Sequence, residues 1–324
     1  MKAIICETLG PPSNLQYKEV PNLEPGPKQV VISVKACAVN FPDTLIIQGL
    51  YQMRPDLPFS PGSDIAGIIK SVGSEVKRFK AGDEVFGVVP YGGMAEEVLS
   101  TTKNIFPKPE AMSFPIACSF LYAYGTSLHA LKDRALLQEG ETIAIMGASG
   151  GVGLAAVDIA KKLGAKVIAC ASTDEKLDLC KEYGADQTIN YTTEDLKSRI
   201  KELTDGKGAD VIYDPVGGDY SEPALRAMAW RGRYLVIGFA AGAIPKIPLN
   251  LALLKGCAIT GVFWGRFTQE EPQNNLANSL QIMKWFEAGK IKPHIHKMYP
   301  LEEASKALEE MMGRRVKGKV IVTV

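Results

Sequence analysis

The feature that most constrains this chain is a glycine-dense turn between an apolar strand and a helix of small residues. The strand is expected at 142–146, and Gly150, Gly151 and Gly153 follow it, with Ala148 where the first glycine of the usual fingerprint would be. Glycines let the backbone approach a pyrophosphate, and the helix N-terminus adds free N–H groups and partial positive charge. The pattern therefore predicts a dinucleotide site. The residues expected at its phosphates are Ala148, Ser149, Gly150, Gly151 and Val152.

Strands and helices alternate along the next ninety or so residues. The expected strands are 166–171, 187–191, 210–213 and 232–237, and the expected helices are 152–163, 174–183, 195–204 and 222–229, with Thr193 capping the third helix. This alternation predicts an α/β fold with a doubly wound parallel sheet and helices on both faces. Gly147, Gly217 and Gly238 would then lie along one edge of the sheet, where a dinucleotide would bind.

The first 120 residues and the last 35 follow a different pattern, with short strands separated by Pro and Gly. The expected early strands are 2–7, 15–20, 29–38, 64–72, 83–89 and 95–99, and the late elements are a strand at 295–299, a helix at 301–312 and a strand at 319–322. We expect residues 1–121 and 289–324 to form one antiparallel β-rich substrate domain. Residues 122–288 would form the nucleotide domain, and nicotinamide and substrate would meet in the cleft between the two.

Composition excludes several classes of protein. The 324 residues are too many for one such fold, and 46% hydrophobic with 23% charged residues is ordinary for a globular enzyme. A net charge of +1 gives no electrostatic reason to expect nucleic acid or a membrane as partner. The six cysteines include no C-x-x-C pair, and the sequence shows no signal peptide or spanning segment. We therefore expect a cytoplasmic protein with reduced thiols.

Several short motifs carry a family resemblance that runs from end to end. They are A-V-N-F-P-D at 38–43, G-L-Y at 49–51, F-S-P-G-S-D-I-A-G at 59–67, Y-G-T-S-L-H-A-L at 124–131, G-A-S-G-G-V-G at 147–153, D-P-V-G-G at 214–218 and G-K-V-I-V at 318–322. On these motifs the chain resembles the zinc-lacking quinone oxidoreductase branch of the medium-chain dehydrogenase/reductase superfamily. The resemblance implies a GroES-like β domain, a Rossmann domain and a homodimer.

Metal chemistry separates this branch from related alcohol dehydrogenases. The resemblance places a zinc-binding cysteine of those relatives where Asn40 stands here, and their His-Glu pair where Ser63 and Asp64 stand. Zinc needs three protein ligands and an open position, and the three histidines of this chain pair with no suitable cysteine. We expect no metal, and no alcohol dehydrogenase activity.

The residues after the second strand of the nucleotide domain indicate the cofactor. An NAD enzyme commonly has an acidic residue there to hold the ribose 2′-OH. This chain has Ser172 and Thr173, with Lys176 close enough to neutralise a 2′-phosphate, although acidic residues lie beside it at 174 and 175. The resemblance adds Tyr191 and Arg314 to that pocket. We expect NADPH as the cofactor.

Further cofactor contacts are implied only by the resemblance. They comprise Asn40 and Thr126 near the nicotinamide and its ribose, a loop of Gly238, Phe239 and Ala240, a strand end of Val262, Phe263 and Trp264, and Lys319. Phe263 and Trp264 could instead lie at a subunit interface, and Lys319 could be an exposed strand residue.

The hydride acceptor must need no metal, which leaves quinones or the double bond of an enone or 2-alkenal. The candidate catalytic residues are Tyr51 and Asn40. Tyr51 is either a proton donor or an aromatic wall of the pocket, and Leu45 stands where the family often has a second tyrosine. Quinone reduction is the leading prediction and double-bond reduction the alternative. A crystallin-like or RNA-binding role is the alternative of another class, with the basic residues at 314–319 as the only cluster to test.

Overall fold

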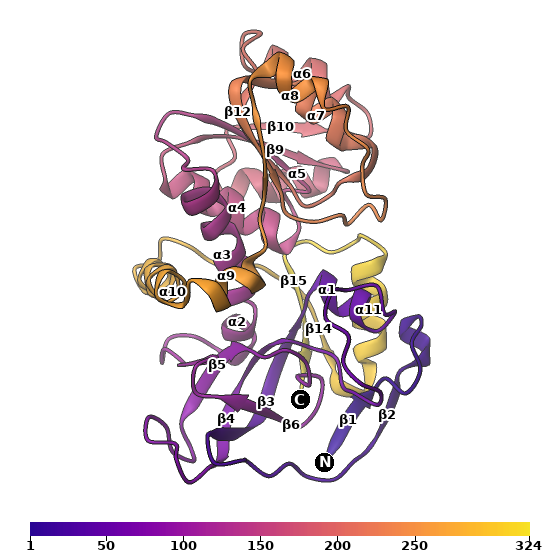
Figure 1. Cartoon of the computed structure of the whole chain (residues 1–324), viewed down its shortest axis with the longest axis vertical. Coiled ribbons are helices and arrows are strands. Elements are labelled where there is room, and N and C mark those ends of the chain that lie inside the picture. The colour runs from indigo at the N-terminus through magenta and orange to yellow at the C-terminus, as the bar shows by residue number, and fades with distance from the viewer. The chain divides into compact units, whose positions relative to one another are not determined.

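The computed structural model describes all 324 residues and divides into two units. Unit 1 comprises Met1–Tyr122 and Pro293–Val324, and unit 2 comprises Ala123–Lys292 (Figure 1). The boundaries expected from the sequence are 121/122 and 288/289. Each unit has its own sheet and its own core.

Unit 1 is built on a seven-stranded sheet in the order β14-β15-β3-β4-β5-β7, with β6 also pairing with β3. The strands are β3 (Gln29–Val39), β4 (Asp64–Val72), β5 (Glu84–Val88), β6 (Glu97–Thr101), β7 (Ile105–Pro107), β14 (Ile295–Pro300) and β15 (Lys319–Thr323). A separate antiparallel pair consists of β1 (Lys2–Ile5) and β2 (Gln16–Glu19). The chain's last strand, β15, pairs antiparallel with β3, so the C-terminal segment completes the sheet begun near the N-terminus.

Three helices pack on this sheet: α1 (Phe41–Ile46), α2 (Phe114–Cys118) and α11 (Ala304–Met312). Helix α11 buries Ala304, Ala307 and Leu308, which recur at helical spacing and face the core. The first two helices and β7 are absent from the sequence prediction because each is too short to show a period. The pair β14 and β15 is parallel, so the expectation of an antiparallel domain holds only for the other pairs.

Unit 2 contains a six-stranded sheet in which all pairs are parallel, in the order β10-β9-β8-β11-β12-β13. The strands are β8 (Thr142–Met146), β9 (Lys166–Ala171), β10 (Gln187–Asn190), β11 (Ala209–Asp214), β12 (Met228–Val236) and β13 (Ala258–Gly261). The order reverses between β8 and β11, which is the position where dinucleotides bind in this architecture. The doubly wound parallel sheet predicted from the sequence is confirmed.

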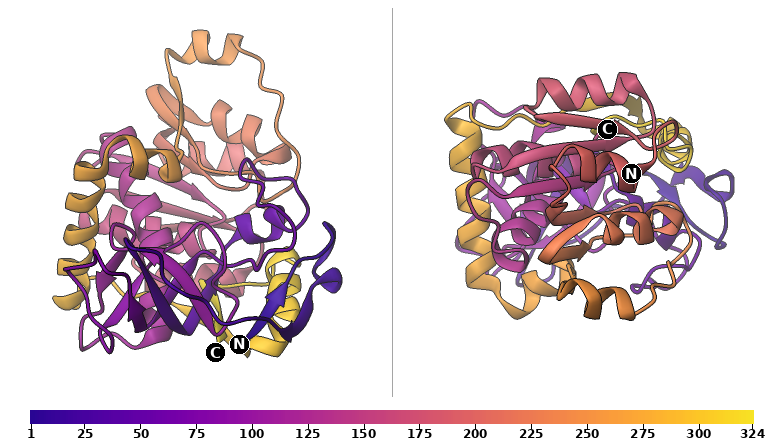
Figure 2. Two further views of the ribbon diagram at one scale, coloured as in Figure 1. Left: turned by 60° about the horizontal axis from the view of Figure 1, so that its bottom comes forward. Right: turned by 90° about the horizontal axis from the view of Figure 1, so that it is seen from above.

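The helices of unit 2 are α3 (Leu121–Leu128, beginning at the unit boundary), α4 (Gly151–Lys162), α5 (Asp174–Glu182), α6 (Leu196–Glu202), α7 (Ser221–Arg226), α8 (Asn250–Lys255), α9 (Trp264–Glu270) and α10 (Pro272–Glu287). Helices α4 to α7 of unit 2 pack against the strands of its sheet (Figure 2, right), whereas α9 and α10 pack on each other. None of the helices in the structure is both long enough and apolar enough to cross a membrane.

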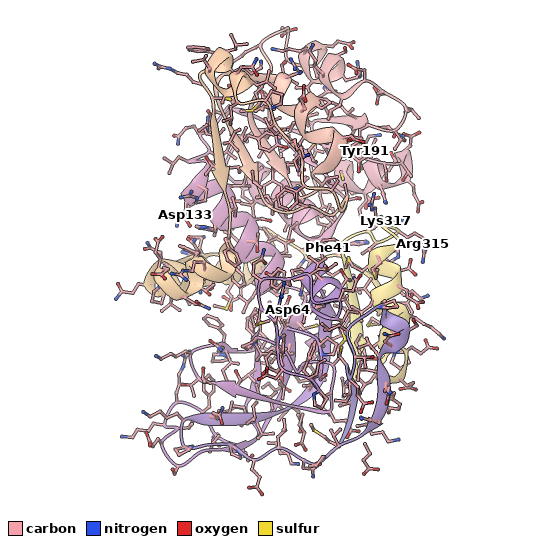
Figure 3. The ribbon with its side chains drawn as sticks, turned by 45° about the vertical axis from the view of Figure 1, so that its right-hand side comes forward. Phe41, Asp64, Asp133, Tyr191, Arg315 and Lys317 are labelled. Carbon is pink, nitrogen blue, oxygen red and sulfur yellow. The ribbon has the colours of Figure 1, made fainter.

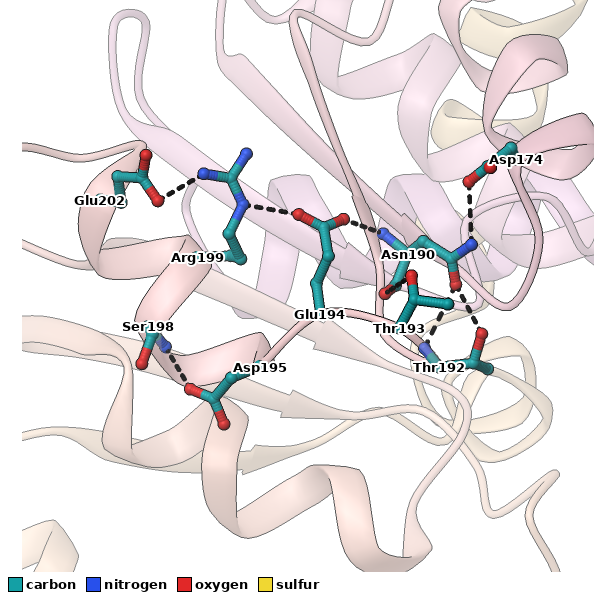
Figure 4. A network of polar contacts seen from close by, with 9 residues as sticks. All are labelled: Asp174, Asn190, Thr192, Thr193, Glu194, Asp195, Ser198, Arg199 and Glu202. Atoms are coloured by element: carbon teal, nitrogen blue, oxygen red, sulfur yellow. Dashed lines mark hydrogen bonds and ion pairs between the residues drawn. The ribbon is translucent and has the colours of Figure 1, made fainter.

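Two local predictions in unit 2 are wrong. Asp195, and not Thr193, caps α6: its carboxylate accepts the Ser198 N–H at 2.8 Å (Figure 4). A carboxylate at the N-cap satisfies a free N–H and also suits the helix dipole. The helix expected at 222–229 ends at Arg226, because β12 begins at Met228 and pairs there with Ala209.

Candidate functional site

The glycine turn of unit 2 brings α4 against the end of β8. A Cβ on Gly153 would lie 2.3 Å from the Gly147 carbonyl oxygen, so only glycine fits at this position. Gly147 itself has φ +56°, which glycine adopts at little cost. Gly150 is the N-cap of α4, and no side chain caps the helix. The first-turn N–H groups of α4 are thus free of side-chain acceptors, which suits an anion.

Thr126 contributes a second feature that fits a bound ligand. It lies on α3 and is buried, yet its hydroxyl oxygen has no hydrogen-bond partner. Buried hydroxyls in native structures are normally paired. The neighbouring Gly125 lies against the indole ring of Trp264, where a Cβ would come within 2.9 Å. Trp264 is buried on α9 while Phe263 before it is exposed, and the N–H of Val262 bonds the Val236 carbonyl oxygen at 3.0 Å.

The residues after β9 lie together as the sequence predicts. Thr173 caps α5, and its hydroxyl accepts the Lys176 N–H at 3.4 Å. The Lys176 ammonium donates to the Ser172 hydroxyl at 3.1 Å. The Thr192 hydroxyl, whose proton is shared between two acceptors, lies 3.1 Å from the Ser172 carbonyl oxygen, so the segment after β10 lies beside this group. A lysine and three hydroxyl residues therefore gather at the end of β9.

Asp174, one of the two acidic residues next to this group, is bonded to the last residue of β10. The Asn190 amide donates to Asp174 Oδ1 at 2.8 Å, and Asn190 Oδ1 accepts from both the N–H and the hydroxyl of Thr192 (Figure 4). The Asn190 N–H donates to Glu194, whose other oxygen accepts from Arg199. A carboxylate already bonded to Asn190 is less available for a ribose hydroxyl. This removes much of the argument against NADPH that the acidic neighbours raised.

The predicted cofactor contacts in unit 2 also include Tyr191 and the loop after β12. The ring of Tyr191 packs on Tyr220 with centroids 4.5 Å apart. The Ile237 and Ala240 N–H groups bond the carbonyl oxygens of Asp214 and Pro215, both at 3.0 Å. The loop containing Gly238, Phe239 and Ala240 is thereby fixed to the loop after β11 at the carboxyl edge of the sheet.

The second group of predicted residues lies in unit 1, where three strand ends meet. Asn40 follows β3, Lys319 begins β15 and Asp64 begins β4 (Asp64 is labelled in Figure 3). The Lys319 ammonium donates to Asn40 Oδ1 at 2.5 Å and lies 3.6 Å from Asp64 Oδ2. All three side chains are buried, so the alternative of an exposed Lys319 is wrong.

Burial perturbs the carboxylates of this group. Asp43 on α1 accepts the Asn40 N–H at 2.7 Å. Burial raises the pKa of Asp43 to about 6 and that of Asp64 to about 7, although Lys319 opposes both shifts. One buried cation thus faces two carboxyl groups whose pKa values burial raises toward neutral pH.

Tyr51 is half-buried in the same unit and hydrogen-bonds a tyrosine that the sequence analysis does not single out, Tyr122. Burial raises the pKa of Tyr51, while the bond from Tyr122 lowers it. Burial also holds the pKa of the Tyr122 hydroxyl well above its ordinary value. Both hydroxyls therefore keep their protons at neutral pH and can act as donors.

The other residues considered in the sequence analysis lie outside these groups. Arg314 is exposed in unit 1 with φ +55°, and its role stays a prediction. His129 bonds Asp133 at 2.9 Å and stacks on Phe267, which is a structural role. No group of three or more His, Cys, Asp or Glu side chains in the structure is placed to hold a metal ion.

Sequence reasoning missed Asp43 and Tyr122, and considered Asp64 only as a position of metal ligation in relatives. One sequence signal could have indicated the pairing of Asp64 with Lys319. Asp64 and Lys319 are charged first residues of strands, and each is followed directly by an apolar run, I-A-G-I-I and V-I-V. Opposite charges in such positions indicate a buried pair when the two strands lie in one sheet.

Two family models match the chain. Residues 26–110 match the alcohol dehydrogenase GroES-like domain, and residues 151–282 match the zinc-binding dehydrogenase family. The first lies within unit 1 and the second within unit 2.

Curated relatives and solved structures match the whole chain. A quinone oxidoreductase-like protein 2 homolog of Nematostella vectensis is 40% identical over 99% of this chain and 88% of its own length. The structure of Escherichia coli quinone oxidoreductase complexed with NADPH is 31% identical, with a TM-score of 0.93 over all of both chains. The structure of the CurK enoyl reductase is 26% identical, with a TM-score of 0.90 over 99% of this chain and 98% of that one.

Replacing Asp64 should change how stability depends on pH. Because the folded-state pKa is raised from 3.8 to about 7, the folded chain keeps a proton that the unfolded chain releases. The contribution of Asp64 to the free energy of unfolding therefore falls as pH rises between these values. The stability of the wild type relative to Asp64→Asn should fall by about 2–3 kcal/mol between pH 5 and pH 7. Urea denaturation of both proteins across this range measures it.

The exposed Asp56 offers a matched control. For Asp56→Asn, the plot of unfolding free energy against pH should run parallel to that of the wild type. Parallel curves for Asp64→Asn and the wild type would show that Asp64 titrates normally.

Proposed function

Because the chain belongs to the quinone oxidoreductase branch of the medium-chain dehydrogenase/reductase superfamily, we propose that it is an oxidoreductase that reduces quinones with NADPH. The observation that carries the cofactor choice is the group of Ser172, Thr173 and Lys176 at the end of β9, with Asp174 bonded to Asn190. The relative from Escherichia coli binds NADPH, and this chain matches it over its full length.

The residues of unit 2 fit this cofactor. The uncapped N-terminus of α4 would hold the pyrophosphate, and Lys176 with the nearby hydroxyls would hold the 2′-phosphate. The unpaired hydroxyl of Thr126 would gain a partner from the nicotinamide nucleotide. Asn40 of unit 1 is proposed to contact its nicotinamide end. NADPH supplies a hydride, and these side chains bind and orient the cofactor.

The acceptor is proposed to bind unit 1 beside Tyr51. Reduction of a quinone adds a hydride and leaves an oxyanion, which takes one proton to become a hydroquinone. Such an anion is delocalised, so water can protonate it and Tyr51 need only line the pocket. The alternative is reduction of an enone or 2-alkenal, favoured by the match to an enoyl reductase. There the developing enolate needs a donor, and the Tyr51 hydroxyl with its bond to Tyr122 would supply one.

Neither reaction is proposed to use a metal. The side chains at the positions that ligate zinc in related enzymes are Asn40, Ser63 and Asp64. Asn40 and Asp64 already contact the Lys319 ammonium. A divalent cation and this ammonium would compete for the same oxygens.

We further propose that the chain is a homodimer that associates through unit 2. Strand β13 is the edge of its sheet and exposes Ile259. Leu253 and Leu254 on α8 and Phe263 after β13 are also exposed. An unpaired edge beside large apolar side chains is suited to cover by a second copy.

Replacing Lys176 tests the cofactor choice. Lys176→Ala should weaken NADPH binding about ten- to a hundredfold, since a charge-assisted hydrogen bond contributes roughly 1.5–3 kcal/mol. NADH lacks the 2′-phosphate, so its affinity should change little. Calorimetric titration with each nucleotide measures both. Lys181→Ala is the control, because Lys181 is an exposed lysine of the same helix. Equal losses for the two nucleotides would refute the assignment.

Replacing Tyr51 separates the two acceptor classes. Tyr51→Phe keeps the ring and removes the hydroxyl, so quinone reduction should change little. Loss of one donor to a developing oxyanion costs about 2.7–4 kcal/mol, so reduction of an enal should slow about a hundred- to a thousandfold. Steady-state kinetics with both substrates on the one variant measures this. A large loss with quinones would mean that Tyr51 is a proton donor for them as well.

A further inference from the structure

Lys319, Asn40 and Asp64 are distant in sequence but come together through strand pairing. Strand β15 runs antiparallel to β3, with Val320 opposite Val39, so Lys319 lies beside Asn40 at the end of β3. Strand β4 is also antiparallel to β3, with Asp64 opposite Ala38. The starts of β15 and β4 therefore meet the end of β3 at one end of the sheet.

The bond from Lys319 determines which way the Asn40 amide faces. An ammonium can only donate hydrogen bonds, so the atom 2.5 Å from it must be the amide oxygen. The amide nitrogen then lies 3.4 Å from the Ala38 carbonyl oxygen, which can only accept. The Asn40 N–H is held separately by Asp43 at 2.7 Å. Backbone and side chain of Asn40 are thus both fixed, and the amide has one allowed orientation.

Asp64 supplies the counter-charge that such an ammonium needs. Lys319 is 4% exposed and Asp64 1% exposed, and an unpaired charge at this depth is strongly unfavourable. Asp64 Oδ2 is 3.6 Å from the ammonium and has no hydrogen-bond partner of its own, while the Asp64 carboxyl group also has a side-chain hydrogen bond with Asn40. The ammonium therefore lies closer to the amide than to the carboxylate. The shortest contact of the ammonium is with Asn40, and the Asp64 carboxylate balances the positive charge of Lys319.

We propose that Lys319 and Asp64 are positioning residues that act through Asn40, with Lys319 orienting its amide and Asp64 keeping the ammonium in place. This inference rests on the proposed NADPH-dependent function, in which Asn40 contacts the nicotinamide end of the cofactor. The fixed amide oxygen keeps a lone pair for a ligand hydroxyl or amide N–H. NADPH carries both, on its nicotinamide ribose and its carboxamide. Lys319 thus affects the cofactor without contacting it, in place of the direct contact that the resemblance implied.

A double-mutant cycle in NADPH affinity tests this inference. Asn40→Ala and Lys319→Met should each weaken NADPH binding about three- to tenfold, the range expected for one neutral hydrogen bond. The double variant should bind no more weakly than Asn40→Ala alone, because Lys319 acts only through that side chain. Fluorescence titration of the purified full chain gives all four dissociation constants.

Lys108→Met is the matched control. Lys108 is another buried lysine of unit 1, with its ammonium 2.9 Å from Glu84 and 2.7 Å from the Met112 carbonyl oxygen. This variant should lower stability while leaving NADPH affinity unchanged, with or without Asn40. If Lys319→Met does not fold, Asp64→Asn takes its place in the cycle with the same expectation.

The outcomes distinguish failure of the positioning inference from failure of the proposed NADPH-dependent function. Losses that multiply in the double variant would show that Lys319 acts independently of Asn40, and would overturn the inference while leaving the proposed function intact. A wild type that does not bind NADPH would overturn both.

Discussion

A buried ammonium, that of Lys319, sets the arrangement of the site in unit 1. Burying a cation is tolerable only when acceptors surround it, and here Asn40 and Asp64 come from the ends of the neighbouring strands. The antiparallel pairing of β15 with β3 and of β3 with β4 brings these three residues to one end of the sheet. The C-terminal segment, which returns to the sheet built by the first hundred residues, thereby becomes part of the site.

Unit 2 depends on a different constraint, the close approach of α4 to β8 at Gly153. This contact directs the uncapped helix N-terminus along the carboxyl edge of a parallel sheet. The loops after β9, β10, β11 and β12 reach the same edge. A hydrogen bond from Thr192 joins the second of these loops to the first, and one from Ala240 joins the fourth to the third. An edge of this kind can present many small polar contacts to one elongated ligand, which is what a dinucleotide requires.

Most of unit 2 could be predicted from the sequence because its signals are local. The strand at 142–146, the glycines after it and the cluster at Ser172–Lys176 each lie within a few residues of one another, and periodicity predicts the strands and helices from 152 to 237. Helices α3, α8, α9 and α10 and strand β13 are absent from the sequence prediction. The site in unit 1 could be predicted only in part. Asn40 and Tyr51 came from family resemblance, whereas the bond between Lys319 and Asn40 joins residues 279 positions apart and depends on strand register. Short helices such as α1, and pairs such as Tyr51 with Tyr122, leave no period in the sequence. Residue type alone favours Thr193 as the cap of α6, whereas Asp195 two positions on has the capping geometry.

The central claim is that the chain transfers a hydride from NADPH to an organic acceptor without a metal. The most direct measurement is the stoichiometry of NADPH oxidised to quinone reduced, under anaerobic conditions, with protein that has been exhaustively chelated. We expect a one-to-one ratio and a rate unaffected by chelation. Loss of activity on chelation that is restored by added zinc would contradict the claim, as would tight NADPH binding with no oxidation by any quinone or enal.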